Sequence, residues 1–204
     1  MNQKNILRQA MSQTIPIADD EWEAFEPHIY AKKVKKRDLL LREGQVSNQI
    51  CFLISGAFRQ FYMIDGEEKT TFFFFENHFV CDYDSFLTLR PCDHNIEAME
   101  DSELLAFDRE TLLRMYRLYP TFETFGRLIA ESVYLCIKDR LMHFLLNTPE
   151  ERYRRFLQST ESDIILQRVP QHYVASYLGI TPVSLSRIRA RVAKSVSPKL
   201  IVAV

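Results

Sequence analysis

Apolar residues are spaced differently in the two halves of this chain. Between residues 29 and 108 they fall in short runs, separated by turn pairs such as Ser55-Gly56 and Asp65-Gly66. Short apolar runs bounded by glycine turns predict β-strands, and the Asp-Gly pair predicts a hairpin. The runs expected as strands are 31–35, 38–42, 49–54, 57–64, 69–75, 95–99 and 103–107. Such a series favours a β-sandwich or a β-roll.

Four consecutive phenylalanines, Phe72 to Phe75, cannot alternate with polar residues along a strand. Successive side chains of a strand point to opposite faces. We therefore expect one pair to line the interior of the roll and the other pair to pack under a helix.

From Asp108 the apolar spacing becomes helical. It predicts a short amphipathic helix over 108–118 and, after Pro120, a long helix over about 121–146. Two apolar stripes run along the long helix. One consists of Phe122, Phe125, Ile129, Val133 and Ile137, and the other of Leu128, Leu135 and Met142. A helix with two apolar faces needs two partners. The β-domain can cover one face, and the same helix of a second copy the other.

Helices are also expected at both ends of this core. Residues 1–29 are predicted to be helical, with Trp22 and Phe25 packing onto the β-domain, and residues 150–159 form a further expected helix. The boundary between two domains, 1–147 and 148–204, is placed at Asn147 to Pro149.

The segment 169–194 predicts two short helices joined by a tight turn. The first covers about 171–178, and Gly179 follows at the position where a helix end favours positive φ. Thr181 is a suitable N-cap and Pro182 a suitable first helical residue for the second helix. This is the layout of a helix-turn-helix, whose second helix enters the DNA major groove. An ordinary helical hairpin with a solvated basic face is the alternative.

Charge distribution favours the first of these alternatives. From residue 150 onward the chain carries nine Lys and Arg against four Asp and Glu, while the preceding residues carry 17 against 23. A basic end on an acidic body is typical of a protein that meets nucleic acid at that end.

Other chemistries find little support in the sequence. The four cysteines are scattered without a CxxC pair and the five histidines are dispersed, so we expect no metal site and no cofactor. Patterns of nucleophilic or nucleotide-dependent enzymes are missing from the sequence, so we expect no catalytic residues and no enzyme activity. The sequence contains no signal peptide and no membrane-spanning apolar run, which indicates a cytoplasmic protein without a membrane partner.

The order of a β-roll, a long helix and a C-terminal helix-turn-helix resembles the Crp/Fnr family of bacterial transcription regulators. The segments REGQVSNQICFLISGAFRQFY and ERYRRFLQ…VPQHYVASYLGITPVSLSRIRARV carry the resemblance, and the second is most similar to Bacteroidetes-type members. The resemblance implies an α+β fold: a β-roll sensor domain with a long dimerisation helix, then a small helical winged-helix or helix-turn-helix domain. It also implies a homodimer on a double-stranded DNA operator, a small-molecule effector, and RNA polymerase as a candidate partner.

The resemblance assigns roles along the expected recognition helix, 181–193. Val183, Ser184 and Arg187 match positions from which family members reach base edges. The residues expected to contact phosphates are Thr181, Ser186, Arg189, Arg191 and Lys194. Pro182 and Val183 replace a charged pair of the cyclic-AMP-responsive members, so their operator sequence cannot be transferred to this chain.

The expected effector pocket departs further from the family pattern. Family members that bind cyclic nucleotides have a phosphate-binding cassette with a Gly-Glu pair, a short helix and an arginine. This chain has Asp82, Tyr83 and Asp84 in place of the Gly-Glu pair, and Cys92 or Asp93 at the arginine position. The tentative pocket residues are Phe73, Asp82, Tyr83, Asp84 and Arg90. Because added carboxylates repel a phosphate, we expect no cyclic-nucleotide binding of the family type and a degenerate or altered pocket.

Two functions from different classes remain. The leading hypothesis is a homodimeric, sequence-specific DNA-binding transcription regulator. The alternative is an effector-binding module whose C-terminal hairpin docks on a protein partner instead of DNA.

Overall fold

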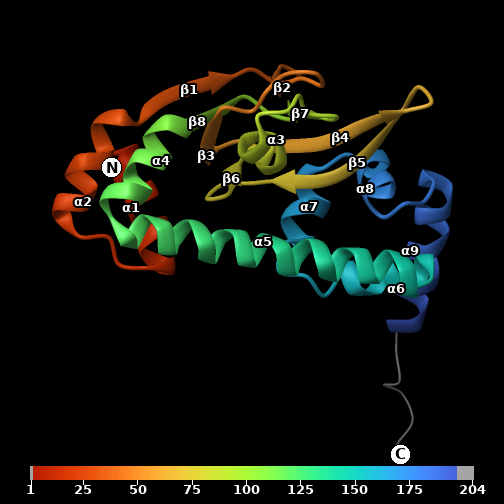
Figure 1. Ribbon diagram of the computed structural model, residues 1–204. Coiled ribbons are helices and arrows are strands. Elements are labelled where there is room, and N and C mark those ends of the chain that lie inside the picture. The colour runs from red at the N-terminus through yellow and green to blue at the C-terminus, as the bar shows by residue number, and fades with distance from the viewer. Residues whose placement is uncertain (1, 197–204) are drawn as a thin grey trace, which may run out of the picture.

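The computed structural model describes residues 2–196, and Figure 1 shows a β-roll with a long helix beneath it. The chain begins with α1 (Gln3–Thr14), α2 (Asp19–Phe25) and a 3₁₀ turn, η1 (Glu26–His28). Phe25 makes edge-to-face contacts with Phe107 and Phe122, at centroid distances of 5.0 and 5.1 Å. These rings join the N-terminal helices to the roll, as the sequence predicts.

The roll consists of two four-stranded antiparallel sheets, with strand orders β1-β8-β3-β6 and β2-β7-β4-β5. Its strands are β1 (Tyr30–Val34), β2 (Leu39–Leu41), β3 (Gln49–Ser55), β4 (Phe58–Ile64), β5 (Glu67–Phe74), β6 (Phe79–Val80), β7 (Asn95–Ala98) and β8 (Ser102–Asp108). The seven expected strands are confirmed, while the pattern misses β6 because two residues have no detectable periodicity. Asp65 and Gly66 both have positive φ, +53° and +79°, which a type I′ hairpin requires.

The phenylalanine run divides between two hydrophobic clusters, as expected. Phe74 is buried between the sheets with Phe58 and Ile96, and Phe72 packs against the same cluster. Phe73 and Phe75 face outward and are buried beneath the C-terminal helices.

Three helices belong to the central part of the chain. The helix α3 (Tyr83–Thr88) lies between β6 and β7, and α4 (Arg109–Leu118) and α5 (Pro120–Leu146) follow β8. Pro120 is the first residue of α5, where its missing N–H costs no helical hydrogen bond. Phe122 and Phe125 near the start of α5 are buried, whereas Leu135 and Leu146 in its second half are 59% and 76% exposed. No helix in the described range is both long and apolar enough to cross a membrane.

The C-terminal helices are α6 (Pro149–Phe156), α7 (Ser162–Arg168), α8 (Gln171–Tyr177) and α9 (Pro182–Val196). Thr148 and Glu151 form a capping box at the start of α6. The sequence pattern does not predict α7. The winged-helix part of the expectation is not met in residues 148–196, which contain helices and no strand. In Figure 1, α7 and α8 lie between α5 and the β4–β5 hairpin.

Candidate nucleic-acid interface and effector pocket

The turn between α8 and α9 depends on Gly179. The Ile180 N–H donates to the Ala175 carbonyl at 3.0 Å and the Gly179 N–H donates to the Ser176 carbonyl at 2.9 Å. These paired bonds form a Schellman motif, which requires positive φ at the residue after the helix cap. Gly179 has φ +66°, and a Cβ atom there would lie 2.6 Å from Cε1 of Phe144 on α5.

Helix α9 begins as the sequence predicts. The Ser184 N–H donates to Oγ1 of Thr181 at 3.1 Å, so Thr181 is the N-cap. Leu185, Ile188 and Val192 are buried against the other C-terminal helices. The inner face of α9 therefore anchors it, and the opposite face is available for contacts.

The eight residues expected to contact DNA lie at the N-cap, on the outer face or on the flanks of α9. Ser184 is half-buried, and the others are exposed: Thr181, Val183, Ser186, Arg187, Arg189, Arg191 and Lys194. Arg189 bonds to Gln171 on α8 and Arg191 pairs with Glu150 at 3.1 Å, while Arg187 has no hydrogen bond or ion pair within the described residues. Residues 182–194 include no acidic side chain, so this face is uniformly cationic or neutral.

Two arginines hold the α8–α9 pair against its neighbours. Arg140 of α5 donates to the Tyr177 carbonyl at 2.8 Å, and Arg152 of α6 donates to the Leu178 carbonyl at 3.0 Å. Cations at these carbonyls also interact favourably with the negative end of the α8 dipole. Sequence analysis misses both arginines, because helical spacing does not show which helix will meet the end of α8.

The first turn of α3 contains three of the residues expected in the effector pocket. Oδ1 of Asp82 accepts from the Ser85 N–H at 3.1 Å, so this buried carboxylate caps the helix. Tyr83 stacks on Phe86, with ring centroids 6.1 Å apart, and Asp84 is exposed. The Asp82 carboxylate is thus a structural group that any phosphate at this place would meet.

The electrostatics around α3 are negative. Burial, followed by the charges of Asp93, Asp82 and Asp84, raises the pKa of Tyr62. The ring of the buried His94 lies 5.2 Å from the Tyr62 ring, and its Nε2 is 3.8 Å from Oδ2 of Asp82. These groups provide no fixed positive charge for an anion.

Neither Arg90 nor the buried Arg59 supplies that charge. Arg90 is exposed beyond the end of α3. Arg59 is 1% exposed, but it pairs with Glu68 and Glu97 at 2.7 and 2.6 Å. Its guanidinium lies 3.8 Å from the ring centroid of Tyr173 on α8, so it belongs to the outer face of the roll.

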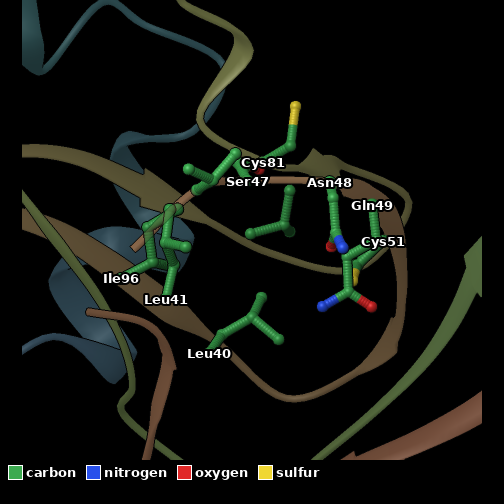
Figure 2. Close-up of a pocket in the computed structure, with 10 residues that line it drawn as sticks. Leu40, Leu41, Ser47, Asn48, Gln49, Cys51, Cys81 and Ile96 are labelled. Carbon is green, nitrogen blue, oxygen red and sulfur yellow. The ribbon is translucent and has the colours of Figure 1, made fainter. Parts of the chain in front are cut away.

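One cavity of the roll, between β2 and β3, is small. It measures about 30 Å³, and Figure 2 shows Leu41 and Ile96 on one side of it and Asn48 and Gln49 on the other. Ligand sites are typically 300–1,000 Å³, so this cavity has room for about one or two water molecules. None of the five expected pocket residues lines it.

Phe73 requires a correction. Its ring packs against Tyr177 of α8 at 5.2 Å, on the face of β5 that points away from the interior of the roll. The structure therefore brings Asp82, Tyr83 and Asp84 together and leaves Phe73 and Arg90 outside that group.

Comparison with known proteins shows which domain family the roll is similar to. Residues 31–119 match the cyclic nucleotide-binding domain. The matched segment runs from β1 to the end of α4 and contains α3. No curated protein sequence matches the chain.

Solved structures extend the likeness beyond the cyclic nucleotide-binding domain. FixK2 from Bradyrhizobium japonicum aligns at 15% identity and TM-score 0.67, covering 82% of this chain and 85% of its own. CLP from Xanthomonas campestris, described as a c-di-GMP-responsive global regulator, aligns at 16% identity and TM-score 0.64, covering 87% and 93%. The catabolite activator protein of Thermus thermophilus aligns at 20% identity and TM-score 0.55, covering 95% and 91%. The shared fold is a β-roll followed by a long helix and further helices.

Proposed function

We propose that this protein is a homodimeric, sequence-specific DNA-binding transcription regulator in which α9 is the recognition helix. The observation that carries the proposal is the glycine turn leading into a capped helix whose exposed face holds four cations and no acid. Two proteins of the same fold are named as a global regulator and a catabolite activator, which agrees with the proposal.

Within α9, the proposed roles follow side-chain chemistry. Arg187 can donate two hydrogen bonds to a guanine, and Val183 can contact a thymine methyl group, with Ser184 beside them. The remaining exposed residues of α9 contact phosphates and fix the register on the duplex.

The proposed dimer forms through α5. Its second half exposes a series of apolar side chains, namely Val133, Leu135, Ile137, Leu141, Met142, Leu145 and Leu146. A second copy of α5 would bury this surface, and Leu128, Leu135 and Met142 recur at the seven-residue spacing of a helix pair. Residues 1–147 then form the sensor and dimer unit and 148–204 the DNA unit, with RNA polymerase and an unknown small-molecule effector as candidate further partners.

The direct test is selection of bound sequences from random double-stranded DNA by the full chain. Enriched sites should be palindromic, with half-sites about 34 Å apart, because each copy contributes one recognition helix. Binding measured by fluorescence anisotropy should weaken steeply with salt, with a slope of about −0.9 for each phosphate contacted. The absence of enrichment, or an α9 that binds a protein with little salt dependence, would favour the protein-docking alternative.

A further inference from the structure

The proposed DNA unit, which contains α6 to α9, packs against the roll as well as following α5. One continuous hydrophobic cluster contains Phe73 and Phe75 of the roll together with Tyr153, Ile165 and Leu178 of the C-terminal helices. Rigid orientation of α9 relative to the roll follows from a shared core of this kind, because packed cores transmit rather than absorb displacement.

Arg168, the last residue of α7, clamps this interface. Its Nε and Nη2 donate to Glu100 at 3.0 and 2.8 Å, and its Nη1 and Nη2 donate to Glu76 at 2.7 and 3.0 Å. Nη2 also donates to the Gly56 carbonyl at 2.9 Å. Bidentate pairing with two carboxylates is geometrically specific, so it fixes both the position and the direction of α7.

The electrostatics of the clamp agree with its geometry. Burial alone would raise the pKa of Glu76, but hydrogen bonds from Arg168 and from the backbone N–H of Gly56 hold it below its ordinary value. Hydrogen bonds to Glu100 and Glu76 raise the pKa of the Arg168 guanidinium. The charged forms of Glu76 and Arg168 are therefore the stable ones at neutral pH.

A second contact covers the free edge of β5. The Thr70 N–H donates to Oγ of Ser176 on α8 at 2.9 Å, and that hydroxyl donates to the Glu68 carbonyl at 3.1 Å. The strand lies at the edge of its sheet, where exposed backbone groups otherwise invite non-specific pairing. Ser176 of α8 thus pairs with two backbone groups of this edge when the DNA unit is docked.

Docking leaves the DNA-contacting face of α9 uncovered. The clamp uses α7 and the edge contact uses α8, whereas Arg187 and Ser186 of α9 remain exposed. An autoinhibited arrangement would cover this face. In addition, the buried Asp82 carboxylate caps α3 at the place where a cyclic phosphate would lie, so the roll offers no favourable charge for a cyclic nucleotide.

We propose that the docked arrangement is the DNA-competent one, that Arg168 is its positioning residue, and that it needs no cyclic nucleotide in the roll. This inference rests on the proposed DNA-binding function. Because apparent affinity scales with the fraction of molecules in the competent state, loosening the clamp should weaken DNA binding without removing any contact to DNA.

The test combines DNA binding and hydrogen exchange on the full chain. Arg168→Ala removes the clamp from α7, and Glu100→Gln weakens it from the roll without altering any C-terminal helix. Lys35→Ala is the matched control, since it also removes one cation from an ion pair, with Asp101 on the surface of the roll.

The expected result for Arg168→Ala is at least about a tenfold loss of affinity for the selected operator, as expected when about one molecule in ten remains docked. The salt slope should stay unchanged, because Arg168 does not contact DNA. Peptides covering β5 and α8 should exchange faster, whereas those from the start of α5 should not. Glu100→Gln should shift both readouts in the same direction, Lys35→Ala neither, and added cyclic AMP or cyclic GMP should leave wild-type binding unchanged.

Three results would overturn the inference: wild-type affinity in Arg168→Ala, tighter binding in that variant, or a wild-type protein that binds the operator only with a cyclic nucleotide. If the wild type enriches no DNA at all, both this inference and the proposed function fail. The exchange rates of β5 and α8 then still show whether Arg168 holds the interface.

Discussion

Gly179→Ala tests whether the turn between α8 and α9 is built as the structure indicates. Two separate costs arise at this position. An alanine at φ +66° occupies the left-handed region, which costs about 1–2 kcal/mol for a residue with a Cβ atom. The new Cβ would also lie 2.6 Å from the ring of Phe144. That ring is 37% exposed and lies beside the guanidinium groups of Arg140 and Arg152, each 5.0 Å from its centroid, so a shift of the ring should relieve part of the clash and disturb these two contacts.

Overpacking of this kind costs about 1–3 kcal/mol, so the total destabilisation should be about 2–5 kcal/mol. Gly66→Ala is the matched control. Gly66 has φ +79° with nothing within 4 Å of its missing Cβ, so it should incur the backbone cost alone. The difference between the two variants isolates the contact with Phe144.

Urea unfolding at one fixed protein concentration is the appropriate assay, since the stability of the proposed dimer would depend on concentration. Phe144→Leu removes the clashing ring edge, and in combination with Gly179→Ala it should recover most of the overpacking cost, seen as a coupling energy in a double-mutant cycle. Equal destabilisation by Gly179→Ala and Gly66→Ala would refute the close approach of the turn to α5.

Further predictions address DNA, assembly, ligand and pH. Arg187→Ala should relax base specificity and cost about 1–3 kcal/mol of operator affinity. Arg191→Ala should weaken binding to all DNA sequences alike and reduce the salt slope by about 1. Identical effects of the two variants in anisotropy titrations would contradict these roles. Leu135→Glu should convert the dimer to monomer in sedimentation velocity, and a wild type that is already monomeric at micromolar concentration would contradict the interface. Isothermal titration with cyclic AMP and cyclic GMP should show no specific binding, and micromolar affinity would overturn the description of the pocket. Glu76 has a lowered pKa, so its contribution to docking should be complete above its ordinary pKa of 4.5 and lost as the pH falls through the lowered pKa. Amide hydrogen exchange of β5 at graded pH would show this loss. Exchange protection of β5 that stays constant down to pH 3 would contradict it.

Local chemistry accounts for what could be predicted from the sequence. Asp65-Gly66 determines a hairpin through backbone conformation, and Gly179 with Thr181 determines a helix end and a helix start. The alternation of side chains along a strand was sufficient to divide the phenylalanine run between two faces. These features depend on residues close together in the chain, so a pattern can reveal them.

Features that depend on distant residues could not be found in this way. Phe73 was expected in the effector pocket, but which face of β5 is interior depends on where β4 and β7 lie. Arg168 is separated from Glu76 by 92 positions, and no spacing rule links them. Asp82 is a partial exception: the segment Asp82–Tyr83–Asp84–Ser85 places an acidic residue three positions before the residue whose N–H it caps, which is a recognisable N-cap signal.

The contacts of the C-terminal helices fix the position of α9 within one chain. Arg140 and Arg152 attach the end of α8 to α5 and α6, and Arg168 attaches α7 to the roll. The helix α9 is therefore fixed relative to both the roll and the dimer helix of its own chain. Under the proposed function, the distance between two copies of α9 then depends mainly on how two α5 helices pair, because the links within each chain are already made. Packing between copies of α5, rather than an occupant of the roll, is consequently the variable that would match this protein to the half-site spacing of its operator.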